Sequence, residues 1–529
     1  MSQTKYLIFT GGVLSGLGKG VAAAAIGKLI SNGKKILPIK MDGYLNYDPG
    51  TMNPIEHGEV FVLDDGGEVD MDFGHYERFL GITCKFEWNI TMGKVFHSLL
   101  EKERQGKFLG KTVQLIPHAT DEIKGMIHNI VEKESPDILL VEVGGTVGDM
   151  ENELFIEALR QLKKEVGREN ILYVHLTYVP IPKHVNEPKT KPTQQSIKLL
   201  NERGIEPDII ITRSKDQLDD KIKDKISLFC GVSKEDVISG VNVNSIYKIP
   251  LIFESQNIVN RINKRLNTNY IPDIENWTRL LENINNPNNK EIKIAICGKY
   301  TRLEDSYASI VEALKHCSAH FNVNVNLKWI ETSDIKEIKD ELKDVKGVIV
   351  PGGFGVRGIE GKIKVIQYAR ENNIPFLGLC YGLQLAVIEY ARNVCKLISA
   401  NSTEIDKETE VPIIDVIEGH ESILGKGKTM RLGSYKAILK ENSRVYNLYN
   451  SREVYERHRH HYEVNPKYHN ILEEKGMILS GLSEDGILVE FVEIPEHKFF
   501  VAIQSHPELK SCLDRPAPLF YGFMKACLE

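Results

Sequence analysis

One cysteine in this chain stands where a catalytic nucleophile is usually presented. Cys380 follows the apolar run at residues 375–379, lies between Gly378 and Gly382, and opens a stretch with helical periodicity. A sharp turn from a strand into a helix exposes such a thiol, small neighbours admit a carbonyl substrate, and the positive end of the helix favours the thiolate. The pattern predicts covalent catalysis at Cys380.

A base and a group to orient it follow much later in the chain. His506 and Glu508 stand two positions apart in the motif Gln-Ser-His-Pro-Glu at residues 504–508. On a strand those two side chains share one face, so we expect Glu508 to orient His506 while His506 takes the thiol proton. A free cysteine is more often a small buried apolar residue, but the occurrence of all pieces in this order favours catalysis.

These two segments resemble the class I (triad) glutamine amidotransferases. The resemblance implies that Cys380 attacks the side-chain amide of glutamine, that His506 shuttles protons, and that ammonia leaves. The loop Pro-Gly-Gly-Phe-Gly at residues 351–355 resembles the family's oxyanion loop, in which backbone N–H groups hold the developing oxyanion. By the same resemblance glutamine would be bound by Gly353, Tyr381, Gly382, Leu383, Gln384, Glu404 and His461, with the oxyanion held by Gly353 and Tyr381.

Length and composition limit the remaining choices. The chain has 529 residues, which predicts about three domains or two large ones, and its 42% hydrophobic and 26% charged content is typical of a globular protein. A net charge of −6 gives no reason to expect nucleic acid or a membrane as partner. The eight cysteines include no C-x-x-C pair, which argues against disulfides and zinc and favours the cytoplasm. We see no signal peptide and no apolar run long enough to span a bilayer.

A polar, Asn-rich segment at residues 281–290 marks the clearest boundary between two halves. Both halves alternate short β-branched runs with helical patterns, at residues 6–10, 35–40, 138–143 and 171–176 and then at 292–297, 348–350 and 375–379. This alternation predicts an α/β fold with a parallel sheet in each half. We expect an N-terminal domain at residues 1–275, a linker at 276–290 and a C-terminal domain at 291–529.

The first strand runs into a glycine-rich turn at residues 11–20 and then into an alanine-rich helix. This order predicts a phosphate-binding loop in which Lys19 supplies a mobile charge, with a plain glycine-rich turn as the alternative. The match to a standard P-loop is imperfect, because five residues separate Gly12 from Gly18 and Gly20 stands where Ser or Thr would hold magnesium. Metal would then need other carboxylates, and Asp72 and Glu142 are the candidates. Glu142 and Lys40 are expected at the carboxyl ends of their strands, where ligands gather in parallel sheets.

Several long blocks carry a closer resemblance. They lie at residues 11–20, 48–61, 74–79, 144–149, 189–194, 245–250, 400–404 and 457–460, and they are similar to those of the CTP synthases over essentially the whole chain. The resemblance implies a P-loop-like (dethiobiotin-synthetase-like) amidoligase domain fused to a class I glutamine amidotransferase domain. It implies that ATP phosphorylates the C4 oxygen of UTP, a transfer that needs positive charge and metal rather than covalent help, and that ammonia then replaces the phosphate to give CTP.

The resemblance assigns residues to each ligand. Asp72 and Glu142 would hold Mg²⁺, and Lys40 would stabilise the transferring phosphoryl group. ATP would be bound by Gly16, Leu17, Gly18, Lys19, Gly20, Val21, Lys40 and Asp72. UTP, and CTP as feedback inhibitor, would be bound by Ser15, Asp149, Met150, Glu151, Lys189, Thr190, Lys191, Pro192, Thr193, Gln194 and Lys225. Composition alone would favour a solvated loop for residues 189–192.

The family also implies a path for ammonia and several modes of regulation. Free ammonia is mostly protonated at neutral pH, so a closed path should join the two sites. Pro54, His57 and Val60 match the family's tunnel and gate, although His57 reads equally well as a satisfied loop histidine. GTP activation would act near residues 354–358. A homotetramer (a dimer of dimers), filaments and a cytoplasmic location complete the implied properties.

Some residues depart from the family pattern. Tyr381 stands where Leu is common, which leaves its backbone N–H available, and His461 stands where Arg is usual. The histidine-rich run at residues 456–461 suggests metal at first sight, but its arginines and lack of cysteine favour a solvated or glutamine-lining segment. The segment at residues 405–429 looks shorter than the corresponding segment in many relatives, which argues against regulation through an insertion there.

Two rival functions remain open. Another glutamine-fed ligase, such as a cobyric acid synthase, would lack the block at residues 189–194. A nucleotide-switched assembly protein, akin to partitioning ATPases, would have no use for the Cys-His-Glu set.

Overall fold

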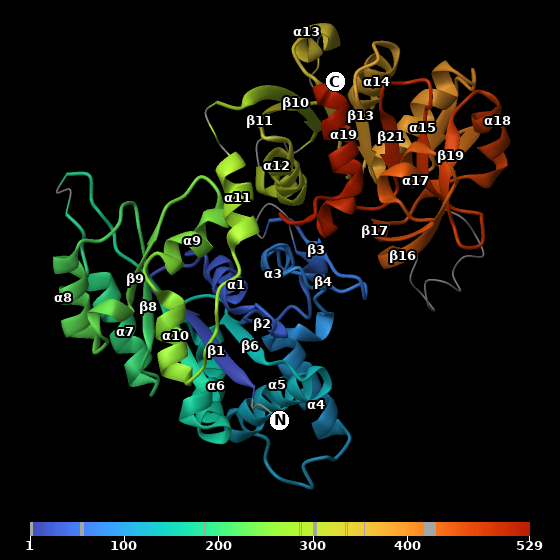
Figure 1. Cartoon of the computed structure of the whole chain (residues 1–529). Coiled ribbons are helices and arrows are strands. Elements are labelled where there is room, and N and C mark those ends of the chain that lie inside the picture. Colours follow the sequence, from blue (N-terminus) through green and yellow to red (C-terminus); the bar gives the residue numbers. More distant parts are fainter. Residues whose placement is uncertain are drawn as a thin grey trace. The chain divides into compact units, whose positions relative to one another are not determined.

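The computed structural model describes residues 4–529 except 53–57, 185–186, 285, 287, 300–303, 334, 336, 354 and 417–429. These residues form two compact units (Figure 1). The first unit comprises Met1–Thr51 and Val69–Thr278, and the second comprises Met52–Glu68 and Arg279–Glu529. The second unit therefore includes a short segment from the N-terminal half of the sequence.

The first unit is built on a seven-stranded sheet with the strand order β5-β2-β6-β1-β7-β8-β9. Every pairing in this sheet is parallel. The strands are fully buried over most of their length, as expected for a parallel sheet covered on both faces. Their bounds are β1 Lys5–Gly11, β2 Ile36–Asp42, β5 Asn89–Thr91, β6 Ile138–Val143, β7 Ile171–Tyr178, β8 Ile209–Ser214 and β9 Val237–Val241.

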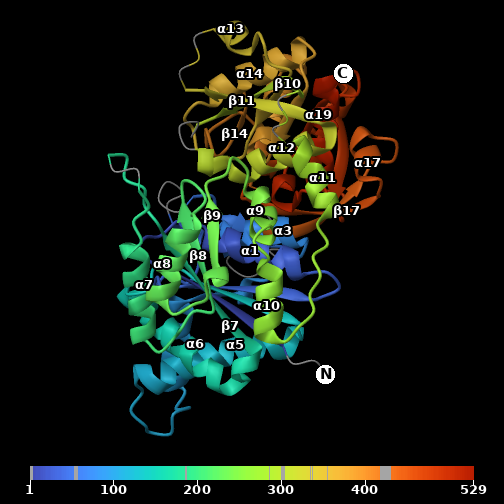
Figure 2. The same cartoon turned by 60° about the vertical axis from the view of Figure 1, so that its left-hand side comes forward.

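Helices flank this sheet, and both views place α7 and α8 beside strands β8 and β9 (Figures 1 and 2). Asp219 caps α8 by accepting a hydrogen bond from the N–H of Ile222, which fixes where that helix begins. The helices are α1 Lys19–Ile30, α3 Asp72–Leu80, α4 Met92–Arg104, α5 Thr120–Glu134, α6 Glu153–Val166, α7 Lys191–Glu202, α8 Asp220–Cys230, α9 Ile249–Glu254 and α10 Ile258–Leu266.

A further helix, α11 (Glu275–Asn283), follows α10, covers the first part of the expected linker and ends within the Asn-rich segment at residues 281–290. Its Trp277 is buried against Phe79 and Tyr247, and the indole N–H donates to the carbonyl of Tyr247 at 2.8 Å. Trp277 falls in the stretch that we expected to be a linker, so this anchor was not predicted.

The second unit has a nine-stranded sheet with the order β11-β10-β12-β13-β21-β20-β19-β16-β17. The strands from β11 to β21 pair in parallel, as predicted, whereas β20, β19, β16 and β17 add an antiparallel edge. The bounds are β10 Lys290–Gly298, β11 Val323–Glu331, β12 Gly347–Val350, β13 Phe376–Leu379, β16 Arg431–Leu439, β17 Glu453–His460, β19 Ile478–Ser483, β20 Val489–Glu493 and β21 Phe500–Ile503. A smaller sheet joins β14 Ala400–Ser402, β15 Val411–Asp415 and β18 Glu463–Val464.

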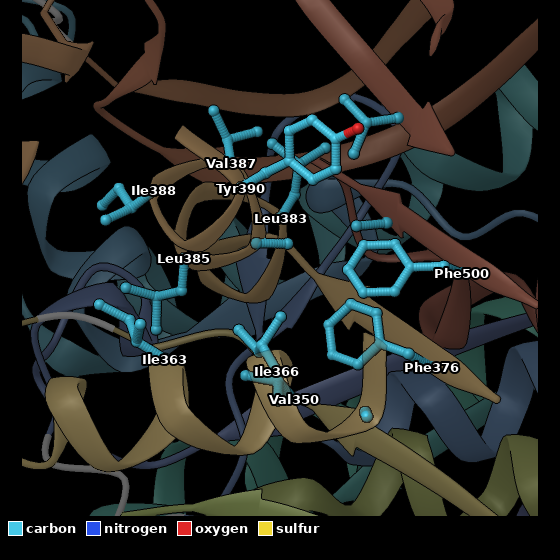
Figure 3. Packing of buried hydrophobic residues seen from close by; sticks show 14 of the residues in the cluster. Val350, Ile363, Ile366, Phe376, Leu383, Leu385, Val387, Ile388, Tyr390 and Phe500 are labelled. Atoms are coloured by element: carbon cyan, nitrogen blue, oxygen red, sulfur yellow. The ribbon is translucent and has the colours of Figure 1, made fainter. Parts of the chain in front are cut away.

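Alternation along the strands sends side chains into two cores, one on each face of this sheet. Val348 and Val350 pack with α14 and α15, whereas Ile349 packs with α12 and α19. Figure 3 shows the first of these cores, where the rings of Phe376 and Phe500 stack at 4.5 Å. The helices are α12 Ala308–Phe321, α13 Ile338–Leu342, α14 Ile359–Glu371, α15 Tyr381–Asn393, α17 Arg444–Tyr449, α18 His469–Glu474 and α19 Pro518–Leu528.

No helix in the described parts of the chain combines the length and the apolar character needed to cross a bilayer. The α/β class predicted from the sequence is confirmed, with sheets of the predicted parallel kind at the centre of both units.

Candidate active sites

The thiol of Cys380 sits on the sharp turn that the sequence predicts. Strand β13 ends at Leu379, Cys380 has a φ of 50°, and α15 begins at the next residue. Such a φ is costly for a residue with a side chain, and it is held here because the N–H of Cys380 donates to Ile503 at 2.7 Å. The neighbouring glycines permit the turn, since a Cβ at position 382 would fall 2.2 Å from the carbonyl oxygen of Val350.

His506 and Glu508 are paired, but they do not lie on a strand. Strand β21 ends at Ile503, and Pro507 starts a 3-10 turn (Pro507–Lys510) because its fixed φ and missing N–H suit the first helical position. The strand geometry expected from the sequence is therefore wrong. The turn nevertheless brings Nδ1 of His506 to 2.8 Å from Oε1 of Glu508, so the base has its orienting carboxylate.

Electrostatics at this pair favour a charged imidazole. Burial works against the imidazolium, but Glu508 and Cys380, which also share hydrogen bonds with His506, raise the pKa of His506 well above its ordinary value. Gly352 permits the close approach, because a Cβ there would fall 2.8 Å from Cε1 of His506 and 3.5 Å from Cβ of Cys380. The three side chains can work as a nucleophile, a base and an orienting group.

A cavity of about 630 Å³ opens onto the thiol. Of the residues predicted to bind glutamine, Gly353, Tyr381, Gln384, Glu404 and His461 line it, together with Val60 from the expected tunnel. Gly382 and Leu383 are buried in the first turn of α15 instead. The cavity is thus suited to an amide side chain held next to Cys380.

The groups expected to hold an oxyanion are placed around this cavity. The N–H of Tyr381 is the first of α15 and lacks a partner within the helix, as helix starts do. The Tyr381 hydroxyl donates to the carbonyl of Gly355 at 3.2 Å, and the N–H of Gly355 donates to Glu404 at 2.8 Å. The tyrosine at this position therefore braces the oxyanion loop through its side chain and leaves its backbone N–H for the cavity.

Sequence reasoning missed several residues near the thiol. Nε2 of Gln504 lies 3.8 Å from Sγ of Cys380, and its motif position beside His506 was the available signal. Lys362 is buried with its ammonium 5.4 Å from the Tyr381 ring, and burial lowers the pKa of Lys362 to about 8. Glu59 also lines the cavity. No local pattern distinguishes Lys362 or Glu59 from surface residues.

Most of the histidine-rich run is buried rather than solvated, although Arg459 is half-buried and His461 is exposed. Arg459, His460 and His461 line the cavity at Cys380, which agrees with the alternative expectation. On β17, Nδ1 of His458 lies 2.9 Å from Nε2 of His460, and burial lowers the pKa of both well below its ordinary value. The ion pairs of Arg431 with Glu463 and Glu490 surround them. Among the described residues, no group of three or more His, Cys, Asp or Glu is arranged to hold a metal ion.

In the first unit, the glycine-rich turn joins β1 to α1 as predicted. Gly16 and Gly18 have φ values of 73° and 83°, which explains their residue type. Lys19 is buried, and its Nζ donates to the carbonyl of Gly145 at 2.7 Å. Burial lowers the pKa of Lys19. The positive end of α1 and this lysine face the same turn, which is how phosphates are bound.

Lys40 lies between the two carboxylates predicted to hold metal. Its Nζ donates to Oδ2 of Asp72 and, at 3.0 Å, to Oε1 of Glu142. Burial opposes the charge on Lys40, but Asp72 and Glu142 raise its pKa well above the ordinary value. The carboxylate oxygens already surround one cation, and such hard oxygen donors are those that Mg²⁺ prefers, so the residues fit the expected metal.

Gly20 explains the departure from a standard P-loop. A Cβ at position 20 would fall 2.2 Å from Oδ1 of Asp72. The carboxylate of α3 therefore takes the place where a Ser or Thr hydroxyl would normally act. Asp42, which the sequence analysis did not single out, joins this edge, and burial, opposed by Lys40, raises the pKa of Asp42 to about 7.

Three predicted segments meet at the carboxyl edge of the sheet. The N–H of Val147 donates to the carbonyl of Gly11 at 2.7 Å, which joins the turn at residues 144–149 to the end of β1. Gly12 abuts α7, because a Cβ at position 12 would overlap Oγ of Ser196. Thus the phosphate loop lies beside both segments expected to bind UTP.

The predicted UTP residues differ in exposure. Thr190 and Thr193 are buried at the start of α7, whereas Ser15, Asp149, Met150, Glu151 and Lys225 are exposed. Asp149 accepts hydrogen bonds from the N–H and hydroxyl of Thr146 at 2.8 and 2.7 Å, and Lys189 pairs with Glu187 at 2.6 Å. Lys191 and Pro192 form the first turn of α7, followed by Gln194. Pro54, His57 and Phe354 lie outside the described residues.

Fold and sites together define a glutamine-dependent ligase with a phosphate-binding unit and a triad glutaminase unit. Residues 5–268 match the family model described as CTP synthase N-terminus, and residues 302–526 match that of glutamine amidotransferase class-I. The CTP synthase of Borreliella burgdorferi is 53% identical over 530 residues, with 99% of both chains covered. That of Methanococcus maripaludis is 52% identical over 535 residues, covering 99% of this chain and all of that protein.

A solved glutaminase domain of Trypanosoma brucei CTPS with bound acivicin is 34% identical, covers 45% of this chain and 94% of that one, and superposes with a TM-score of 0.42. The chain belongs to the CTP synthase family. It is accordingly a ligase whose reaction is the glutamine-dependent conversion of UTP to CTP.

Proposed function

We propose that the two sites divide the reaction between them. Cys380, His506 and Glu508 release ammonia from glutamine, while the edge around Lys19, Lys40, Asp72 and Glu142 transfers the γ-phosphoryl group of ATP to the C4 oxygen of UTP. The observation that carries the proposal is the pairing of His506 with Glu508 beside a thiol held at a φ of 50° on a strand-to-helix turn. A nucleotide-switched assembly protein would have no use for this arrangement.

The geometry of the cavity supports the following course of glutamine hydrolysis. The Cys380 thiolate attacks the amide carbon, and the oxyanion that forms is held by the N–H groups of Tyr381 and Gly353. His506 gives its proton to the leaving nitrogen, ammonia departs, and a thioester remains. Water, deprotonated by His506, then hydrolyses the thioester to glutamate. Gln384 supports amide binding, because among the described residues none donates to its buried Oε1.

Phosphoryl transfer would depend on charge at the sheet edge. Lys19 and the N–H groups at the start of α1 would bind the ATP phosphates, and Lys40 would stabilise the transferring group. Asp72 and Glu142 would hold Mg²⁺, which neutralises phosphate charge when bound. Ammonia then adds to C4 of the phosphorylated ring, and the C4–O bond breaks to release phosphate and leave CTP.

The remaining predicted ligands belong to this proposal as well. Ser15, residues 149–151, residues 189–194 and Lys225 would bind UTP, and the same triphosphate pocket would admit CTP as inhibitor. Val60, which lines the cavity at Cys380, would belong with Pro54 and His57 to the path for ammonia. GTP activation, a homotetramer (dimer of dimers), filaments and a cytoplasmic location stay predictions from the family.

One assay tests the division of labour. Purified protein is mixed with ATP, UTP and Mg²⁺ and with either glutamine or ammonium, and CTP is measured. We expect CTP with both nitrogen sources. Cys380→Ala should abolish the glutamine-driven reaction and keep the ammonium-driven one, because only glutamine hydrolysis needs the thiol. Equal loss of both would contradict the proposal.

A further inference from the structure

A β-hairpin from the N-terminal half of the sequence packs at a defined place in the second unit. It consists of β3 (Phe61–Val62) and β4 (Glu68–Val69). The N–H of Ser434 donates to the carbonyl of Asp64 at 2.9 Å, and a Cβ at Gly433, whose φ is 99°, would fall 2.6 Å from the nitrogen of Gly66. Only glycine combines this φ with such close backbone contact. The turn of the hairpin therefore packs directly on the backbone of β16.

Two carboxylates of the hairpin bind two arginines of β17. Asp64 accepts from Nε of Arg457, and Oε1 of Glu68 accepts from Nε of Arg459 at 2.7 Å. The arginines stand two positions apart, so their side chains project from the same face of β17. Arg457 is 1% exposed, and its guanidinium lies 5.3 Å from the ring of Phe61. A guanidinium buried so completely depends on a carboxylate partner, so the pair of Arg457 with Asp64 ties β17 to the hairpin by a link that is costly to break.

The backbone of the same two arginines touches the catalytic residues. The N–H of His506 donates to the carbonyl of Arg457 at 2.7 Å. The carbonyl of Arg459 lies 3.9 Å from Sγ of Cys380. A shift of β17 would therefore move both the base and the surroundings of the nucleophile.

Asp64 also reaches the turn that carries the orienting carboxylate. Its Oδ2 lies 3.4 Å from Nζ of Lys510, two residues after Glu508, and Lys510 donates to the carbonyl of Tyr455 on β17 at 2.7 Å. Burial opposes the charge on Asp64, but Arg457 and Lys510 hold the pKa of this carboxyl below its ordinary value. Asp64 is thus an anion at neutral pH that joins β17 to the catalytic turn.

We propose that Asp64 and Glu68 are positioning residues for glutamine hydrolysis, which they serve by holding β17 and Lys510 in register with His506 and Cys380. The inference rests on the proposed function, because hydrolysis at Cys380 is the reaction that they support. It means that the glutaminase site is completed by sequence from the N-terminal half of the chain.

Asp64→Asn in the full chain tests this role, because asparagine has nearly the same shape and keeps the backbone hydrogen bond to Ser434 but removes the charge. With ATP, UTP and glutamine present, we expect kcat for glutamate release to fall between about 10- and 100-fold, as small misplacements of catalytic groups do. The pH profile for alkylation of Cys380 by iodoacetamide should shift as well, since the position of His506 sets the thiolate. Ammonium-driven CTP synthesis should keep its wild-type rate, and Asp64→Glu should restore part of the loss.

Glu484→Gln is the matched control, because Glu484 forms an exposed ion pair with Lys436 on the same sheet and touches neither β17 arginine. It should behave as wild type. The inference is overturned if Asp64→Asn releases glutamate at the wild-type rate with an unshifted profile. If Asp64→Asn does not fold, Glu68→Gln decides by the same two readouts. Failure of the proposed function would look different. The wild-type protein would then make no CTP from ammonium, while the rate of glutamate release would still show whether Asp64→Asn disturbs the glutaminase site.

Discussion

Gly20 and the carboxylate of Asp72 occupy adjoining space, so that a Cβ at position 20 would fall 2.2 Å from Oδ1 of Asp72. Gly20 belongs to the first turn of α1, and Asp72 begins α3. A standard phosphate loop places a hydroxyl here for the metal, whereas this chain brings a carboxylate from another helix. The absence of a hydroxyl at position 20 and the presence of Asp72 therefore have the same cause, because a side chain at position 20 would leave no room for the carboxylate of Asp72.

Gly20→Ala should abolish CTP synthesis from both nitrogen sources, because the new methyl group must displace Asp72 from Lys40. Alanine is otherwise the better helix former by about 1 kcal/mol, so we expect little loss of stability. Activity is measured with glutamine and with ammonium, and the melting temperature is measured in parallel.

Gly125→Ala provides the control for this substitution. Gly125 lies in α5, and a Cβ there meets nothing within 4 Å. It should keep full activity and gain slightly in stability. If Gly20→Ala made CTP at the wild-type rate, CTP synthesis would not require the carboxylate of Asp72 in its observed position beside Gly20.

Lys40→Ala should lose both the glutamine-driven and the ammonium-driven reaction by about 100-fold or more, since both need the phosphorylated ring and the lost charge faces the transferring group. The ammonium of Lys40 also separates the half-buried carboxylate of Asp72 from the buried carboxylate of Glu142, and the repulsion between them would then be uncompensated. Glutamate release at Cys380 should continue, which separates a local defect from unfolding. Retained CTP synthesis with either donor would remove Lys40 from its assigned role.

Glu508→Gln should change the pH dependence of glutamine hydrolysis. Glu508 helps raise the pKa of His506 well above 6.5, so removing its charge lowers that pKa. The imidazolium then deprotonates at lower pH, and the thiolate-imidazolium pair is lost on the alkaline side earlier than in wild type. We expect kcat for glutamate release to fall about 100- to 10,000-fold.

The measurement for Glu508→Gln is the rate of glutamate release across the pH range, with ammonium-driven CTP synthesis as the internal control. A wild-type profile with only a uniform loss would mean that Glu508 orients His506 without shifting its titration.

Local patterns predicted the parts of the fold that depend on neighbouring residues. Buried parallel strands read as continuous β-branched runs, which is why β6 and the core of β1 were found with nearly their observed bounds. The turn at Cys380 was predictable because Gly378 and Gly382 are needed for close packing there. Pro507, by contrast, converted an expected strand into a 3-10 turn.

Partners far apart in the sequence account for what was missed. Asp64 and Arg457 are separated by 393 positions, and the residues around each of them give no indication that the two side chains form a pair. The charged run at residues 456–461 suggested exposure, yet Arg431, Glu463 and Glu490 allow His458 and His460 to be buried. Burial of charge is decided by such distant partners, so it cannot be read from one segment.

Gly382→Ala should destabilise the second unit and abolish glutamine hydrolysis together. A Cβ at this position would fall 2.2 Å from the backbone oxygen of Val350, which cannot turn aside as a flexible side chain would. Overpacking of this kind costs about 1–3 kcal/mol, and a shift of α15 would also move the N–H of Tyr381. Calorimetry of the full chain should show a lower melting temperature for the second unit, and glutamate release should fall while ammonium-driven CTP synthesis continues below that temperature. Unchanged melting and unchanged glutamate release would mean that the turn after Cys380 can relax, and that its close packing is not what presents the thiol.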